Sequence, residues 1–172
     1  MAHLYQPIRK LADGDGVEGF DCGQPALNQF IQRFASVSQK SNSAQTYACT
    51  HQGQVAGFYS LTVGSVEYNA GSTRLTKGLP KHPVPVMILA RLAVDTQHQN
   101  VGLGKALLKD ALLRTAQAAE IAGIRALVVH AKDETARQWY EQWEFEPSPS
   151  DPLHLFLLVK DLKKLAFVGK VG

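Results

Sequence analysis

The sequence predicts a single domain of the mixed α/β (α+β) class, in which helices flank a mixed central sheet. Three observations predict it. Strand-like and helical segments alternate along the chain. The run 86–95 is almost wholly apolar, as in a strand that is buried on both faces of a sheet. The 172 residues can build one substantial core but are too few for two. We therefore expect residues 1–172 to form one domain.

The first half of the chain contains a helix, a hairpin and a long connection. Leu27, Phe30, Ile31 and Phe34 recur at spacings of three and four, which predicts one helical stripe. Two strand-like runs within 45–68 are joined by His51-Gln52-Gly53-Gln54, the signal of a β-hairpin. The Gly/Pro/Ser-rich segment 69–85 predicts an exposed loop.

The second half alternates between strands and helices. Strand 86–95 precedes a helix over about 102–122, for which Gly123 is placed as the terminator. The apolar face of this helix consists of Leu107, Leu108, Ala111, Leu112, Thr115, Ala118, Ala119 and Ala122. A strand at 124–131, a helix at 134–143 capped by Asp133, a strand at 153–160 and a short helix at 161–167 complete the pattern.

Composition excludes several classes of protein. The chain is 45% hydrophobic and 19% charged, and it holds no apolar run of about 18 residues, so we expect a cytoplasmic protein without a membrane span. Cys22 and Cys49 lack metal-ligand spacing, and we expect free, partly buried thiols and no metal site. The net charge of +3 is only weak evidence for a nucleic-acid partner.

Two glycines stand where the helix after strand 86–95 must begin. The stretch 99–104 reads QNVGLG, and a glycine-rich helix start can hold a phosphate on bare main-chain N–H groups. Two nucleotide-binding motifs do not fit. A GxGxxG motif would need glycine at Leu107, and a Walker A motif would need Ser or Thr at Ala106.

The pattern Q-x-x-G-x-G after a buried strand resembles the cofactor signature of the GCN5-related N-acetyltransferase (GNAT) superfamily. The resemblance implies the GNAT fold and acetyl-CoA as the acetyl donor. It implies that the main chain of Leu92, Ala93 and Val94 holds the pantetheine and the acetyl carbonyl. It places the phosphates on Gln99, Asn100, Val101, Gly102, Leu103, Gly104 and Lys105.

A second stretch, DETARQWYEQWEF, is similar to a later motif of the same superfamily. Asp133 stands where the family has asparagine, which is implied to contact the cofactor, and Glu144 stands where the family has glycine. The matching Tyr140 is implied to be the general acid. A phenol with a pKa of about 10 stays protonated at neutral pH and can protonate a leaving thiolate. Alternatively, Ala136, Tyr140 and Trp143 form a buried helical stripe.

The acceptor amine must be uncharged to attack. An α-amine, with a pKa of about 7.7–8, is partly neutral at pH 7, whereas a lysine amine needs a strong base. Glu67 and His130 are possible bases, but the sequence favours a surface charge for the first and a satisfied polar group for the second. The lack of a dedicated base favours an α-amine substrate.

The run F-x-C-G-x-x-x-L-N-x-F at 20–30, taken with the motifs above, resembles the TacT/AtaT-type toxins of this superfamily. The resemblance implies acetylation of the α-amine of aminoacyl-tRNA, inhibition of translation, neutralisation by a ribbon-helix-helix antitoxin, and a homodimer. Arg74, Lys77 and Lys81 are then expected to contact tRNA phosphates. Arg91, the one charge in an apolar strand, either pairs with an acid or faces the acceptor cleft.

Two other functions stay open. The chain is either an acetyltransferase for a small amine or a protein N-terminus, or an inactive GNAT-fold binding module. Whether the protein transfers labelled acetyl groups to charged tRNA distinguishes a tRNA substrate from a small amine or a protein N-terminus. Comparing the activity of Tyr140→Phe with that of the wild type distinguishes an enzyme from an inactive binding module.

Overall fold

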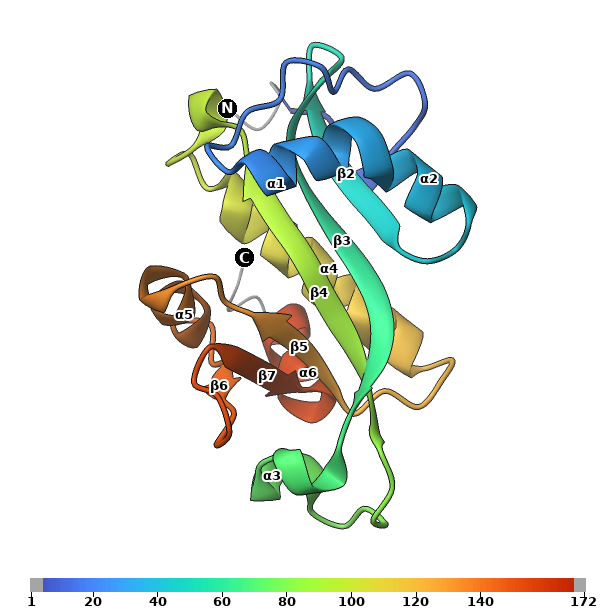
Figure 1. Cartoon of the computed structure of the whole chain (residues 1–172), viewed down its shortest axis with the longest axis vertical. Coiled ribbons are helices and arrows are strands. Elements are labelled where there is room, and N and C mark those ends of the chain that lie inside the picture. The colour runs from blue at the N-terminus through green and yellow to red at the C-terminus, as the bar shows by residue number, and fades with distance from the viewer. Residues whose placement is uncertain (1–4, 169–172) are drawn as a thin grey trace. The chain divides into compact units, whose positions relative to one another are not determined.

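The computed structural model describes residues 5–168 and contains a mixed sheet of seven strands (Figure 1). The strand order is β1-β2-β3-β4-β5-β7-β6. β2 pairs antiparallel with β1 and β3, β4 pairs parallel with β5, and β7 pairs antiparallel with β5 and β6. The predicted mixed central sheet is therefore confirmed.

The elements within these residues have the following bounds. The strands are β1 (Arg9–Lys10), β2 (Gln45–His51), β3 (Gln54–Val66), β4 (Val84–Val94), β5 (Ala126–His130), β6 (Glu146–Pro147) and β7 (His154–Leu158). The helices are α1 (Pro25–Gln29), the π-helix η2 (Phe30–Phe34), α2 (Ala35–Lys40), the 3₁₀ turns η3 (Tyr68–Ala70) and η4 (Thr96–His98), α3 (Thr73–Thr76), α4 (Leu103–Ala119), α5 (Glu134–Glu141) and α6 (Val159–Val168).

The chain divides into two compact units. The first comprises the residues up to Thr62 together with Ala90–Ala111, and the second comprises Val63–Leu89 together with the residues from Leu112 onward.

The first unit is built on the predicted hairpin. β2 and β3 pair from Gln45↔Leu61 to His51↔Gln54. The turn residues Gln52 and Gly53 have φ angles of 52° and 78°, as a two-residue hairpin turn requires. Phe58 of β3 packs edge-on against Phe20 and stacks with Phe30, which joins α1, η2 and α2 to the sheet.

The helical stripe of the first unit differs from the prediction, because the helix contains a π turn. A π turn inserts one extra residue, which rotates the following side chains by about 100° around the axis. Phe30 and Ile31 are buried as predicted, but Phe34 is 51% exposed and Ala35 takes the buried position after them. The expectation of an uninterrupted stripe through Phe34 was therefore wrong.

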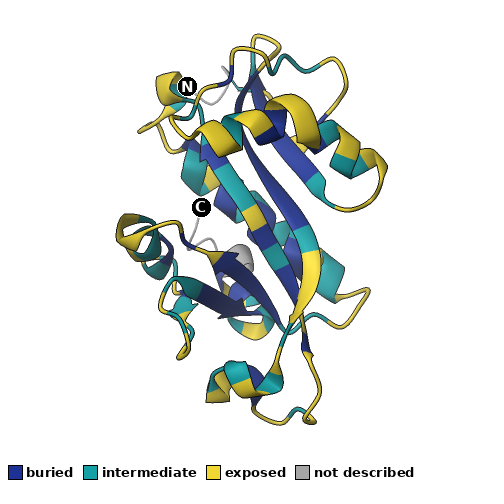
Figure 2. Ribbon diagram, in the orientation of Figure 1, coloured by how far each residue is buried: buried dark blue, intermediate teal, exposed yellow. Residues whose placement is uncertain are grey.

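The second unit has β5 and β7 at its centre, and both strands are buried over most of their length (Figure 2). They pair from Ala126↔Leu158 to His130↔His154. Val84, Val86, Val128 and Phe156 belong to its apolar core, together with Leu75.

The loop predicted at 69–85 is partly helical. It contains η3 and α3, and Leu75 of α3 is only 2% exposed. Ser72 caps α3, because its Oγ accepts a hydrogen bond from the Leu75 N–H. The Arg125 guanidinium donates to the carbonyls of Leu75 and Lys77 at 2.8 and 3.0 Å. These long-range contacts order a segment whose composition alone indicates an exposed loop.

Helix α4 lies where it was predicted but is shorter. It runs from Leu103 to Ala119 and ends before Gly123. The predicted face is buried through Thr115, whereas Ala122 is exposed and Ala116, which the prediction omitted, is buried. Within residues 5–168, no helix combines the length and the apolar character needed to cross a membrane. Cys22 is half-buried and Cys49 is buried, and neither is part of a disulfide within residues 5–168.

Candidate active site

The turn between β4 and α4 belongs to the first unit and is fixed by side-chain hydrogen bonds. Asp95, directly after β4, accepts from the Gln97 N–H at 2.9 Å and from the Asp21 N–H at 3.0 Å. Gln99 Nε2 donates to the Val94 carbonyl at 2.9 Å. These contacts hold the chain in one conformation as it enters α4.

The main chain of this turn presents unused hydrogen-bond donors. Asn100 and Gly102 have φ angles of 64° and 87°, in the left-handed region. Within residues 5–168, the main-chain N–H groups of 99–104 donate no hydrogen bond to another residue, and the first bond into α4 runs from Ala106 N–H to the Gly102 carbonyl. The positive end of the helix dipole lies at the same place. This arrangement fits a diphosphate, as the sequence analysis expected for 99–105.

The last residues of β4 are the ones expected to hold the pantetheine. β4 pairs with β5 over Val86–Leu89, and Leu92, Ala93 and Val94 follow that stretch. Ala93 is 5% exposed, and a Cβ built on Gly57 of β3 would lie 3.2 Å from its carbonyl oxygen. Glycine at position 57 therefore allows close strand packing here. The contact with pantetheine stays a prediction.

Asp133 and Tyr140 lie in the second unit, on α5. Asp133 caps the helix by accepting a hydrogen bond from the Ala136 N–H at 2.9 Å, which confirms the predicted cap. Its contact with the cofactor remains a prediction. Tyr140 is 8% exposed, and its ring lies nearly perpendicular to Trp139 and Phe145 at centroid distances of 5.0 and 5.4 Å.

The Tyr140 hydroxyl is chemically distinctive. Burial raises the pKa of Tyr140 far above its ordinary value, so the phenol stays protonated at neutral pH. Among the described residues the hydroxyl has no hydrogen-bond partner. Its ring is packed against Trp139 and Phe145. Of the predicted stripe, Tyr140 is buried while Ala136 and Trp143 are half-buried. The role of Tyr140 as a general acid stays a prediction.

The sequence left two alternatives for Arg91, which either pairs with an acid or faces the acceptor cleft. Its guanidinium carbon lies 3.7 Å from the centroid of the Phe30 ring, and no acid among residues 5–168 pairs with it. The first alternative is therefore excluded within the described residues, and the second stays a prediction. Desolvation lowers the pKa of Arg91, which nevertheless stays charged at neutral pH.

The three basic residues expected on the 69–85 segment differ from one another. Arg74 forms ion pairs with Glu146 and with Asp161, so its charge is balanced inside the second unit. Local sequence patterns do not reveal this role, because the two acids lie 72 and 87 residues away. Lys77 and Lys81 are exposed and have no ion pair within the described part of the chain. Contact of any of the three with tRNA stays a prediction.

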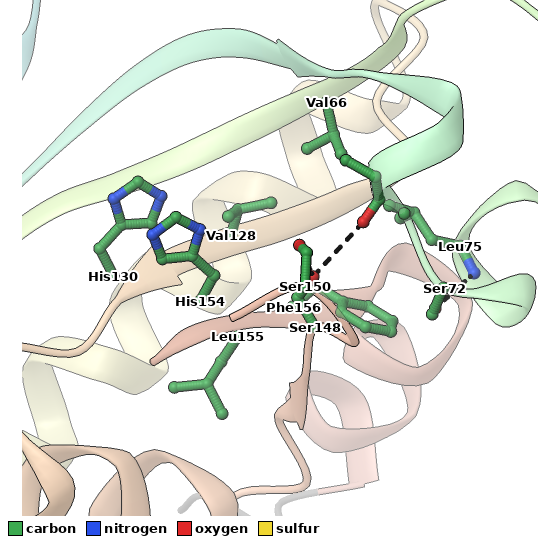
Figure 3. Close-up of a pocket in the computed structure, with 12 residues that line it drawn as sticks. Val66, Ser72, Leu75, Val128, His130, Ser148, Ser150, His154, Leu155 and Phe156 are labelled. Atoms are coloured by element: carbon green, nitrogen blue, oxygen red, sulfur yellow. Dashed lines mark hydrogen bonds between the residues drawn. The ribbon is translucent and has the colours of Figure 1, made fainter. Parts of the chain in front are cut away.

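A small pocket of the second unit was not foreseen. Its volume is about 100 Å³, and it lies between β5, β7 and the segment 66–75 (Figure 3). His130 and His154 stack face to face at one end, with a centroid distance of 3.8 Å and an interplanar angle of 4°. The two histidines meet because they are cross-strand partners in the antiparallel pair of β5 and β7. No group of three His, Cys, Asp or Glu side chains within residues 5–168 is arranged to hold a metal ion.

The turn after β4 lies in the first unit and the helix that carries Tyr140 lies in the second, and both are features that the sequence assigned to an acetyl-CoA-dependent acyltransferase. The family model for the acetyltransferase (GNAT) domain matches residues 42–147. The chain therefore belongs to the GNAT acetyltransferase family.

Four matches to known proteins specify the likeness further. A tRNA-acetylating toxin of Mycobacterium tuberculosis (strain ATCC 25618 / H37Rv) is 41% identical over 161 residues, which cover 94% of this chain and 96% of the toxin. The crystal structure of a KacT mutant, in which one tyrosine is replaced by phenylalanine, has a TM-score of 0.87 at 26% identity and covers 94% of this chain and 99% of its own. AtaT complexed with acetyl-methionyl-tRNAfMet has a TM-score of 0.85 at 28% identity, with 92% and 98% covered. AtaTR bound with AcCoA has a TM-score of 0.82 at 27% identity, with 95% and 98% covered. These solved structures confirm the GNAT fold.

Proposed function

We propose that this acetyltransferase is a toxin that acetylates the α-amine of aminoacyl-tRNA and thereby inhibits translation. The observation that carries the proposal is the relative named as a tRNA-acetylating toxin, which matches nearly the whole chain at 41% identity. The AtaT complex with acetyl-methionyl-tRNAfMet supports it, because that ligand is the product of the same chemistry. The match over both units also supports one acetyltransferase domain spanning 1–172.

Acetyl-CoA supplies the acetyl group as a thioester, and the first unit offers the groups to hold it. The unused N–H groups of 99–104 would bind the diphosphate, with Lys105 beside them. The main chain of Leu92, Ala93 and Val94 would align the pantetheine and, through an N–H, the developing oxyanion. A metal has no part in this scheme.

Tyr140 is proposed as the general acid that protonates the departing thiolate. Its support is local: the hydroxyl is protonated at neutral pH and has no hydrogen-bond partner among the described residues. The packed ring fixes its direction. Asp133 would assist from the cap of the same helix.

Basic side chains would bind the tRNA. Lys77 and Lys81 are exposed, and Arg91 is a charge held on a ring without an acidic partner among the described residues. Arg74 would contribute less than these three, since two carboxylates already balance it. A ribbon-helix-helix antitoxin, a homodimer and a cytoplasmic location complete the proposal. Structural relatives support the antitoxin, since AtaT is known bound to the C-terminus of AtaR.

A competition assay tests the function. The purified protein receives labelled acetyl-CoA and three acceptors: charged tRNA, a peptide with a free N-terminus, and a small primary amine. We expect label on the aminoacyl group of tRNA, released together with the amino acid by mild base. Label that accumulates on the peptide or the amine instead would contradict the proposal in favour of the alternative substrates. No transfer to any acceptor would favour an inactive binding module.

A further inference from the structure

The pocket of the second unit joins an apolar wall to two imidazoles. Val66, Leu75, Val128 and Phe156 form most of the wall, and Ser72, Ser148 and Ser150 add hydroxyl groups. Figure 3 shows the stacked rings of His130 and His154 at the end away from Ser72 and Leu75. A volume of about 100 Å³ is too small for a cofactor, since sites for such ligands measure about 300–1,000 Å³. It suits one amino-acid side chain.

The two imidazoles have different electrostatic surroundings. Asp151 Oδ2 lies 3.4 Å from His154 Nε2, while His130 stacks on His154 and has no carboxylate partner among the described residues. Desolvation and then the neighbouring His154 lower the pKa of His130, and Asp151 opposes this shift weakly. The remaining residues that line the pocket carry no ionisable group. His130 is therefore neutral at pH 7 and can accept a proton.

We propose that the aminoacyl group of the charged tRNA enters this pocket and that His130 accepts the proton which its α-ammonium group must lose. The proposal rests on the proposed function. The N–H bond of the ammonium breaks, the proton passes to an imidazole nitrogen of His130, and the electron pair remains on the amine as the nucleophile. The proton then leaves to solvent from His130, which is exposed, or through His154 and Asp151.

The position of His130 along the chain agrees with this role. It is the last residue of β5, and α5 with Tyr140 begins four residues later in the same unit. A proton acceptor for the amine and a proton donor for the thiolate would thus come from consecutive elements. His130 and Tyr140 would act on two different atoms, which allows their substitutions to be told apart.

A pH profile of His130→Gln tests the inference. At pH 6 only about 1–2% of an α-amine with a pKa of about 7.7–8 is neutral, whereas at pH 9 most of it is. We expect kcat/KM for charged tRNA to fall about 100-fold or more at pH 6 and by less than about threefold at pH 9, within the range typical of proton-transfer groups. His154→Gln is the matched control. This variant removes a neighbour that lowers the pKa of His130, so the pKa of His130 should rise. The fall in kcat/KM on the acidic side of the pH profile should therefore begin at a higher pH, but it should still be present.

The outcomes separate the inference from the function. An equal loss at every pH would mean a structural role for His130 and would overturn the inference, as would an unchanged profile. In either case transfer to charged tRNA by the wild type leaves the proposed function in place. A wild type that transfers nothing to charged tRNA at any pH overturns both. As a readout besides activity, the His130 ring proton signals should shift on titration with charged tRNA and not with uncharged tRNA; equal shifts would count against the pocket.

Discussion

Two tyrosines allow the same one-atom change to be made in opposite settings. Tyr140 is buried, but its hydroxyl lacks a hydrogen-bond partner among residues 5–168. Tyr59 of β3 is wholly buried, and its hydroxyl donates to Asp110 Oδ2 at 2.6 Å. Replacing either with phenylalanine keeps the ring and its packing. The two variants therefore separate catalysis from stability.

For Tyr140→Phe, no hydrogen bond is lost and the contacts with Trp139 and Phe145 remain. The free energy of unfolding should stay within about 0.5 kcal/mol of the wild type. Loss of a general acid should lower kcat by about 10²–10⁴, which corresponds to about 3–5 kcal/mol of transition-state stabilisation. Because burial raises the pKa of Tyr140, the wild type should show no loss of rate from ionisation of this phenol up to pH 10.

For Tyr59→Phe, the bond to a charged acceptor is lost and the carboxylate of Asp110 loses a donor. We expect a cost of about 1.5–3 kcal/mol, or a decrease in Tm of about 3–12 °C for a chain of this size. The rate of acetyl transfer, measured well below Tm, should stay within about twofold. Thermal denaturation and single-turnover transfer to charged tRNA measure both quantities. A Tyr140→Phe enzyme that is as fast as the wild type, or that loses as much stability as Tyr59→Phe, would refute the assignment.

Three further predictions concern the cofactor turn, the turn after α5 and the basic segment. Gly102→Ala places a side chain at φ 87° and should strain the turn by about 1–3 kcal/mol. Calorimetry should then show acetyl-CoA binding that is about 5- to 100-fold weaker. Gly123→Ala, the control, should leave acetyl-CoA binding unchanged. Glu144 has a left-handed φ of 70°, so Glu144→Gly should raise the free energy of unfolding by up to about 1 kcal/mol in urea titrations. Gln142 has a φ of −65°, so Gln142→Gly should lower the free energy of unfolding. Lys77→Gln and Lys81→Gln should each reduce the slope of log K for tRNA against log salt by about 1, and unchanged slopes would exclude both lysines from phosphate contact.

Local patterns in the sequence were sufficient for most of the fold. The hairpin at Gln52-Gly53 and the buried strand β4 follow from turn chemistry and from an unbroken apolar run. The same holds for the turn 99–104, since bare N–H groups at a helix start are a consequence of chain geometry, while its contact with phosphate stays a prediction. Helix α5 was predicted from its cap at Asp133, which the structure confirms.

What the sequence did not predict depends on contacts between distant residues. The π turn changes the phase of the Phe30–Phe34 segment, and no local pattern announces it. Arg125 orders α3 from about 50 residues away. The stacking of His130 on His154 depends on the register of β5 and β7, which single-sequence periodicity leaves undetermined. For the same reason the sequence left two alternatives for Arg91, an acid or the acceptor cleft, and did not reveal its contact with the Phe30 ring.

A crystal structure of the protein with bound acetyl-CoA tests the central claim most directly. The account predicts the diphosphate on the main-chain N–H groups of 99–105 and the thioester sulfur within hydrogen-bonding distance of the Tyr140 hydroxyl. A diphosphate bound elsewhere, or a Tyr140 hydroxyl directed away from the sulfur, would contradict it.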